Sequence, residues 1–263
     1  MRLALFIAAF CGCSATWSQE TNDAGLGKSL VLHLASAPFP HPSRAQGYTY
    51  KGQTYSAAEH YSDNTVAVFI PRGFRETGRV DFVIHFHGWK NDVSNVLKRY
   101  RLVDQLVASG RNAVLVVPQG PKNAPDSSGG KLADANGFRR FMDDITDLLR
   151  QGGALRQTNF SVGQIILSGH SGAYKVIASI LDHGGFPELV REVWLFDALY
   201  ADTDKFMAWM DRTPAGRLVN IYTDGGGTKR DTEALIAALK QRSTPFLAAE
   251  ETDLKAGDLR RRG

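Results

Sequence analysis

The sequence predicts an α/β fold, with a mostly parallel central sheet and helices on both of its faces. From residue 80 onward, short apolar runs alternate with segments in which apolar residues follow helical spacing. The apolar runs are nearly uninterrupted, which is typical of strands that are buried on both faces. The polar residues that could carry chemistry follow these runs directly, and in parallel sheets active sites gather at the carboxyl ends of the strands.

Each expected element has its own signal. The apolar runs predict strands over residues 29–36, 65–70, 80–86, 113–117, 164–167, 193–196, 218–222 and 246–249. Helical spacing predicts helices over residues 93–106, 138–149, 174–181, 206–210 and 232–240. Gly110 is suited to close the first of these helices, and Pro118 ends the strand that follows it. Between residues 36 and 65, prolines and tyrosines indicate an irregular surface segment or a hairpin.

Length and composition fit one domain of ordinary size. The chain has 263 residues, of which 43% are hydrophobic and 22% charged. We divide it into a signal peptide (1–18), an N-terminal extension with the first strands (19–64) and a main α/β domain (65–263). The net charge of +4 is mild, and Arg260, Arg261 and Arg262 account for much of it. A nucleic-acid partner is therefore not expected.

The beginning of the chain has the pattern of an export signal. Arg2 precedes a short apolar core over residues 3–10, which is too short to span a membrane as a helix. We therefore expect export to the periplasm or the extracellular space, and no transmembrane segment. Cys13 could carry a lipid anchor, although the residues before it match a lipidation motif poorly. Both cysteines of the chain lie in this segment, so the rest of it has no disulfide chemistry.

The most informative motif is Gly169-His170-Ser171-Gly172-Ala173. It lies between an apolar run and a segment with helical spacing, which predicts a strand, a sharp turn and a helix with Ser171 at the tip. Small residues at 169 and 173 are needed because the strand and the helix nearly touch there. Ser171 would then be a nucleophile. The alternative is a serine that merely caps the helix.

A second motif, His85-Phe86-His87-Gly88-Trp89, ends an earlier strand. His85 and His87 are expected to hold this loop by hydrogen bonds, with Gly88 letting the backbone turn. Because residues two apart on a strand point to the same face, the two histidines could instead bind a metal. The sequence offers no obvious third ligand, so no metal is expected.

Together, these two motifs resemble the α/β-hydrolase superfamily. Residues 118–121 after the next strand, and the helix that contains residues 143–145, are similar to its secreted esterase branch, which includes feruloyl-esterase-like and polyhydroxybutyrate-depolymerase-like proteins. The resemblance implies a nucleophile at Ser171 and an oxyanion hole formed by the backbone N–H groups of Trp89 and Gly172. It also implies a small-molecule ester or acyl substrate and no cofactor. It does not predict the oligomeric state.

The resemblance leaves the acid of the triad open between two aspartates. Asp197 follows the strand after the elbow, and Asp224 follows the next one. The superfamily usually places the acid after the later strand, whereas some lipases use the earlier one. The aspartate that is not used would be a turn or capping residue.

The superfamily order also requires a histidine after the last strand. No histidine follows His183, and residues 250–263 contain none. His183 itself should lie at the far end of the elbow helix. The fold is therefore expected to be C-terminally incomplete, as in a fragment or a frameshifted reading of a longer enzyme. Two alternatives are a non-catalytic binding protein on the same scaffold and an unrecognised base such as His60 or His87. We thus predict an exported serine hydrolase by ancestry, with impaired catalysis in this chain.

Overall fold

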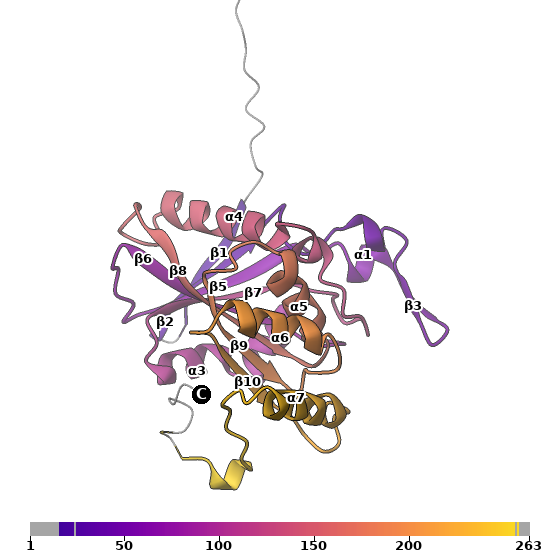
Figure 1. Ribbon diagram of the computed structural model, residues 1–263. Coiled ribbons are helices and arrows are strands. Elements are labelled where there is room, and N and C mark those ends of the chain that lie inside the picture. Colours follow the sequence, from indigo (N-terminus) through magenta and orange to yellow (C-terminus); the bar gives the residue numbers. More distant parts are fainter. Residues whose placement is uncertain (1–15, 24, 256, 258–263) are drawn as a thin grey trace, which may run out of the picture.

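A computed structural model describes residues 16–23, 25–255 and 257 of the chain (Figure 1). Its centre is an eight-stranded sheet of order β1-β2-β5-β7-β6-β8-β9-β10. The strands of this sheet are β1 (Thr16–Asp23), β2 (Gly27–His33), β5 (Thr65–Pro71), β6 (Arg79–Phe86), β7 (Ala113–Pro118), β8 (Ser161–His170), β9 (Val190–Phe196) and β10 (Arg217–Ile221). The helices are α1 (Ala57–His60), α2 (Val93–Arg99), α3 (Leu102–Ser109), α4 (Gly137–Gln151), α5 (Tyr174–His183), α6 (Thr203–Arg212) and α7 (Lys229–Gln241).

The sheet is mostly parallel, as the sequence predicts. The five neighbouring strands β7, β6, β8, β9 and β10 all pair in parallel. Strand β5 pairs antiparallel with both β7 and β2, and β1 pairs antiparallel with β2. The parallel strands therefore place their carboxyl ends along one edge, where β8 ends at His170 and β9 at Phe196.

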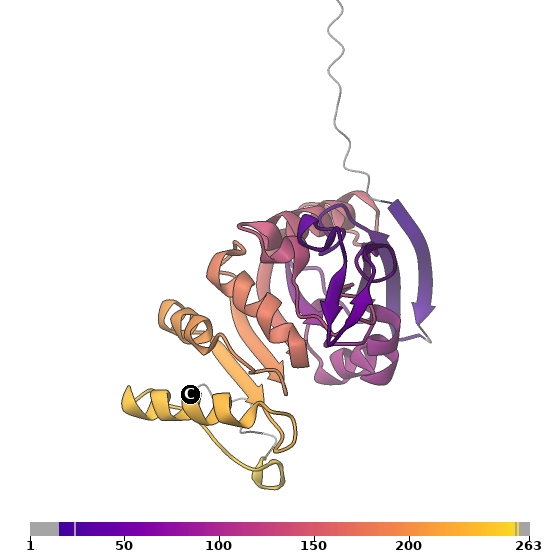
Figure 2. The same ribbon diagram turned by 90° about the vertical axis from the view of Figure 1, so that its right-hand side faces the viewer.

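Helices cover the two faces of the sheet unequally (Figure 2). On one face, side chains of α4, α5, α6 and α7 share a large core with alternate residues of the strands. On the other face, α2 and α3 form a smaller core over β5 and β7, with members such as Leu106, Leu115 and Val117. The prediction of helices on both faces is correct. The second face, however, is covered over only part of its width.

Two expected elements differ from the structure, and a third is confirmed. The single helix predicted over residues 93–106 is divided into α2 and α3, because Arg101 adopts a left-handed conformation (φ 50°). Residues 246–249 belong to no strand, so β10 is the edge of the sheet. Leu247 in this segment is 58% exposed. The hairpin expected among the tyrosines is present as β3 (Tyr48–Tyr50) and β4 (Gln53–Tyr55).

The structure describes only the last three residues of the predicted signal peptide. Residues 16–18, which the sequence assigns to the signal peptide, begin β1. Residues 1–15, including Cys13, lie outside the described residues. Among the residues that the structure describes, no helix is long and apolar enough to cross a membrane.

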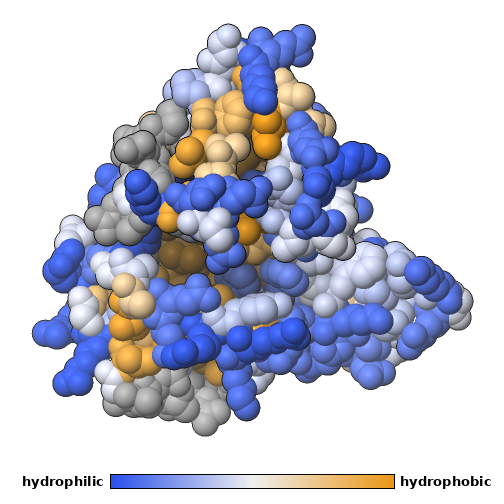
Figure 3. Space-filling model, turned by 90° about the horizontal axis from the view of Figure 1, so that it is seen from below, coloured by the Kyte–Doolittle hydropathy of each residue, from blue (hydrophilic) through white to orange (hydrophobic). Residues whose placement is uncertain are grey.

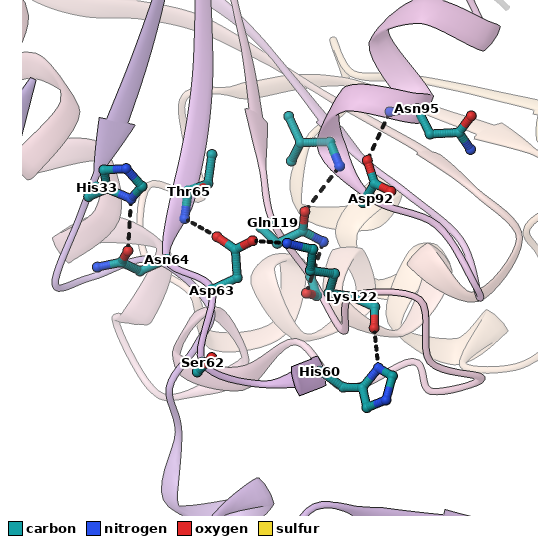
Figure 4. Close-up of polar contacts among 12 residues, drawn as sticks. His33, His60, Ser62, Asp63, Asn64, Thr65, Asp92, Asn95, Gln119 and Lys122 are labelled. Carbon is teal, nitrogen blue, oxygen red and sulfur yellow. Dashed lines mark hydrogen bonds and ion pairs between the residues drawn. The ribbon is translucent and has the colours of Figure 1, made fainter. Parts of the chain in front are cut away.

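Polar contacts join the loop after β6 to the loop after β7. Further contacts join the loop after β7 to the segment before β5 (Figure 4). The backbone N–H of Lys90 donates to the Ala124 carbonyl at 2.9 Å, so the two loops run side by side. Lys122 forms an ion pair with Asp63 at 2.8 Å, and its carbonyl contacts Nδ1 of His60 at 2.7 Å. These contacts fasten the β7 loop to the start of β5, and through it they fix the loop that follows β6.

The two phenylalanines at residues 82 and 246 test this division between core and surface. Phe82 is fully buried in the centre of the sheet, whereas Phe246 is 36% exposed in the unpaired segment. We expect Phe82→Ala to lower the free energy of unfolding by about 3–5 kcal/mol and Phe246→Ala to lower it by no more than about 0.5 kcal/mol. Urea unfolding of the two variants measures the difference. An equal loss would mean that residues 246–249 do pack as a buried strand.

Candidate active site

Ser171 occupies the tip of a sharp turn between β8 and α5. Its φ of 53° lies in the left-handed region, which non-glycine residues rarely adopt. A short 3₁₀ turn over residues 171–173 leads directly into α5. A Cβ added at Gly169 would lie 2.7 Å from Cβ of Ala173, so the strand and the helix can approach this closely only with small residues. The predicted strand, turn and helix are therefore present, with Ser171 at the tip.

The loop after β6 lies against this turn. A Cβ added at Gly88 would lie 2.8 Å from Cβ of Ser171, so only glycine lets the backbone pass here. Trp89 follows, and its indole N–H donates to Oγ of Ser127 at 2.7 Å. A Cβ on Gly172 would lie 2.6 Å from the same Ser127 oxygen. The Trp89 indole thus packs against Gly172, the residue that follows the serine.

His87 and His85 have different partners. Nδ1 of His87 contacts the Gly88 carbonyl at 2.8 Å, and its Nε2 accepts from the Gly120 N–H at 3.0 Å, so His87 bonds to the loops after β6 and β7. Nδ1 of His85 contacts Oγ of Ser168 at 2.9 Å, so His85 bonds to the neighbouring strand and not to a loop. In the described part of the chain, no three His, Cys, Asp or Glu residues are grouped as metal ligands.

The structure separates the two candidate acids. Asp197 also has a left-handed φ, 47°, and its carboxylate accepts from the hydroxyls of Thr228 at 2.5 Å and Thr223 at 3.2 Å. Asp224 is fully exposed and forms an ion pair with Lys229 at 2.7 Å. Strand register pairs His170, the residue before Ser171, with Phe196, the residue before Asp197, so Asp197 follows the strand next to the elbow. Asp197 is therefore the aspartate at this site, and Asp224 belongs to a surface turn.

Tyr200 is a member of the site that sequence reasoning misses. Its hydroxyl donates to the Gly226 carbonyl at 2.5 Å and lies within hydrogen-bonding reach of the Ser171 side chain. Burial and the Asp197 charge raise the pKa of Tyr200, and the contact with Ser171 offsets them only in part. The phenol therefore stays protonated at neutral pH. Because its only hydrogen is donated to Gly226, the Tyr200 oxygen can act toward any further partner only as an acceptor.

All seven histidines lie in the described part of the chain, and no hydrogen bond joins any of them to Ser171. His170 packs its ring against Tyr100 at 5.5 Å. His60 is held by Lys122, and His183 contacts the Ala133 carbonyl at 2.7 Å, at the far end of α5. His60 and His87, the alternative bases, are thus both engaged in holding loops. The site combines a serine, an aspartate and a tyrosine, without a histidine in contact with the serine.

Comparison with solved structures finds esterases among the similar folds. A ferulic acid esterase aligns with a TM-score of 0.48 and 14% identity, over 69% of this chain and 81% of its own. The feruloyl esterase module from Clostridium thermocellum, complexed with sinapinate, aligns with a TM-score of 0.43 and 12% identity, over 67% and 68%. S-formylglutathione hydrolase from Staphylococcus aureus aligns with a TM-score of 0.47 and 13% identity, over 88% of each chain. No protein-family model matches the chain, and no curated protein matches it.

The sheet order and the elbow together define the architecture. A serine turn at the end of a central parallel strand, with a helix directly behind it, is the arrangement of the α/β-hydrolase fold. The fold that the sequence resemblance implied is thus confirmed.

Replacing each aspartate by asparagine tests which one the site depends on. We expect Asp197→Asn to cost about 1–3 kcal/mol of folding free energy, because the buried Thr228 hydroxyl loses its charged acceptor. Asparagine tolerates the left-handed backbone, so the loss reports the hydrogen bonds rather than strain. Asp224→Asn should leave the urea midpoint unchanged. The reverse order of effects would place Asp224, not Asp197, in the structured site.

His85 should make the protein less stable in acid. Burial, together with the neighbouring His87 and His170 rings, lowers the pKa of His85 to about 3. Below a pH of about 6.5 the unfolded chain takes up a proton there that the folded chain refuses, so the stability from His85 is complete above that pH and is lost toward pH 3. We expect the difference in unfolding free energy between wild type and His85→Phe to shrink by about 2 kcal/mol from pH 7.5 to pH 5. Urea titrations at both pH values measure it, and parallel pH dependences would contradict the assignment.

Proposed function

We propose that the chain is a serine hydrolase of small carboxylic esters, with Ser171 as its nucleophile. The main support is the elbow, where a serine in a left-handed conformation is held against the backbone of Gly88. Strain of this kind persists only where the surrounding structure enforces it, and it exposes the hydroxyl at the tip of the turn. We also propose that the protein is exported, on the pattern of residues 2–10.

The residues around Ser171 would share the steps of ester hydrolysis. Oγ of Ser171 attacks the carbonyl carbon, the alcohol leaves, and water then releases the acid from the acyl-enzyme. Backbone N–H groups of Trp89 and Gly172 suit the oxyanion, because fixed dipoles need no reorganisation as charge develops. The weak point is the serine proton. Tyr200 is a neutral phenol and a poor base, so without a histidine the proton passes to solvent and turnover is slow.

A non-catalytic binding protein is the second candidate, and one observation favours it. The Asp197 carboxylate already accepts from Thr223 and Thr228, and Gly226 packs directly against it. An aspartate engaged in this way has little capacity left to orient an imidazole.

Imidazole rescue tests the hydrolase. We expect slow hydrolysis of p-nitrophenyl acetate by the wild type, and about a tenfold increase when tens of millimolar imidazole supplies the missing base. Ser171→Ala should show neither the slow turnover nor the increase beyond that of imidazole alone. Ser94→Ala, at an exposed serine of α2, is the matched control and should behave as the wild type.

A fluorophosphonate probe separates the two candidates. Labelling of the wild type that Ser171→Ala abolishes indicates a reactive serine. If the wild type is neither labelled nor accelerated by imidazole, the hydrolase proposal fails for this chain and the binding protein stands.

A further inference from the structure

A cavity of about 310 Å³ lies on the less covered face of the sheet, away from Ser171. The hollow is visible from below, with an apolar floor (Figure 3). Its walls come from α3 and from strands β6, β7, β8 and β9, and its apolar lining includes Val83, Leu102, Leu115, Ile166, Trp194 and Phe196. Pockets of about 300–1,000 Å³ with a few polar groups in an apolar lining are the usual form of small-molecule sites.

Polar residues line both ends of this cavity. Strand register pairs Ser168 with Trp194 and His170 with Phe196, at the carboxyl ends of β8 and β9. At the other end, Arg111 donates to both carboxylate oxygens of Glu192, at 2.9 and 3.1 Å. Glu192 also forms an ion pair with Arg217, so the far end holds two guanidinium groups and one carboxylate, all of them in ion pairs. Among the described residues, the buried polar atoms of the lining that have no partner lie at the end beneath the elbow.

Two ring nitrogens at that end have no hydrogen-bond partner among the described residues. They are Nε2 of His85 and Nδ1 of His170, and both atoms are buried. His85 is only 4% exposed, and Ser168 satisfies its other nitrogen. A buried polar atom without a partner is costly, so each unpaired nitrogen in a native structure points to a missing partner.

The chemistry of these groups selects the kind of ligand. Both histidines are neutral in the fold, because burial lowers the pKa of each. A neutral imidazole offers either an N–H or a lone pair, so a hydroxyl, which both donates and accepts, suits either tautomer. A carboxylate is not favoured at this end, because the two rings are neutral and Arg111 lies at the opposite end of the cavity, in an ion pair with Glu192. The rings of Tyr100, Trp194 and Phe196 favour a flat aromatic body.

We propose that this cavity binds a small aromatic alcohol, with its ring between α3 and the sheet and its hydroxyl on Nε2 of His85. This site is independent of ester hydrolysis at Ser171, because its lining does not include the serine.

Two probes of equal size test the proposal in the full chain. 2-Naphthol carries a hydroxyl where 2-methylnaphthalene carries a methyl group. We expect 2-naphthol to bind with a dissociation constant below about 1 mM, and about three- to tenfold more tightly than 2-methylnaphthalene, as a neutral hydrogen bond predicts. Equilibrium dialysis of each probe against the full chain measures both constants. Tighter binding of 2-methylnaphthalene, or binding of neither probe, overturns the proposal.

Variants locate the site. Leu102→Trp fills the cavity from α3 and should weaken 2-naphthol at least tenfold, whereas Val107→Trp, at an exposed position of the same helix, should leave its affinity unchanged. His85→Phe keeps the ring but removes both nitrogens, so it should abolish the preference for 2-naphthol while 2-methylnaphthalene binds as before. Thermal melts confirm that each variant folds. If Leu102→Trp binds as the wild type does, the probe lies elsewhere and the proposal fails. If His85→Phe keeps the preference, His85 is not the partner of the hydroxyl.

Discussion

The left-handed turn at Ser171 is the constraint on which the rest of the site depends. A serine held at a φ of 53° is strained, and its neighbours must leave room for the backbone on every side. The small residues at Gly169 and Ala173 let α5 begin directly behind β8, and Gly88 lets the neighbouring loop pass the serine. At both glycines, an added Cβ would clash with a neighbouring side chain. The turn at Ser171 therefore also constrains the path of the loop after β6, although the serine lies more than eighty residues later in the sequence.

The same geometry explains why an aspartate lies at the site while no described histidine contacts the serine. Asp197 ends a strand that pairs with β8 in register, so its position follows from the sheet. A histidine would have to come from beyond β10, and β10 is the edge of the described sheet. In place of an imidazole, the hydroxyls of Thr223 and Thr228 satisfy Asp197, and Tyr200 lies against Ser171. A charged group near a sheet edge recruits whatever donors its neighbours offer. The threonine hydroxyls thus donate hydrogen bonds to the carboxylate, as a histidine N–H does in a complete triad, but they do not take up the serine proton.

How far the sequence predicts this site depends on the range of the contacts. The elbow, the His-Gly loop and the parallel strands are local patterns, and the residues that carry them are those that the sequence singles out. The choice between Asp197 and Asp224 could not be predicted, because both follow apolar runs and only the packing of residues 223–228 distinguishes them. Tyr200 and Ser127 were missed for a related reason. A tyrosine or a serine in a loop carries no spacing signal, and each reaches the site through a contact far away in sequence. The break between α2 and α3 was missed because the left-handed backbone at Arg101 opposes the preference of arginine.

The second face of the sheet is only partly covered by helices, and it carries histidines with buried ring nitrogens. We relate these two features to each other. His87, on the loop between the strands, has both nitrogens occupied, whereas His85 and His170 each keep one nitrogen unpaired beside the cavity. A helix packed over this face would have excluded water but offered few donors or acceptors, because its backbone groups bond within the helix. Polar residues at this depth are therefore hard to explain as simple core positions, for which aliphatic side chains of the same size would cost less. They make sense if something other than a helix side chain completes their hydrogen bonds. His170 lines the cavity and directly precedes Ser171. A ligand bound in the cavity would therefore contact the residue next to the serine of the elbow.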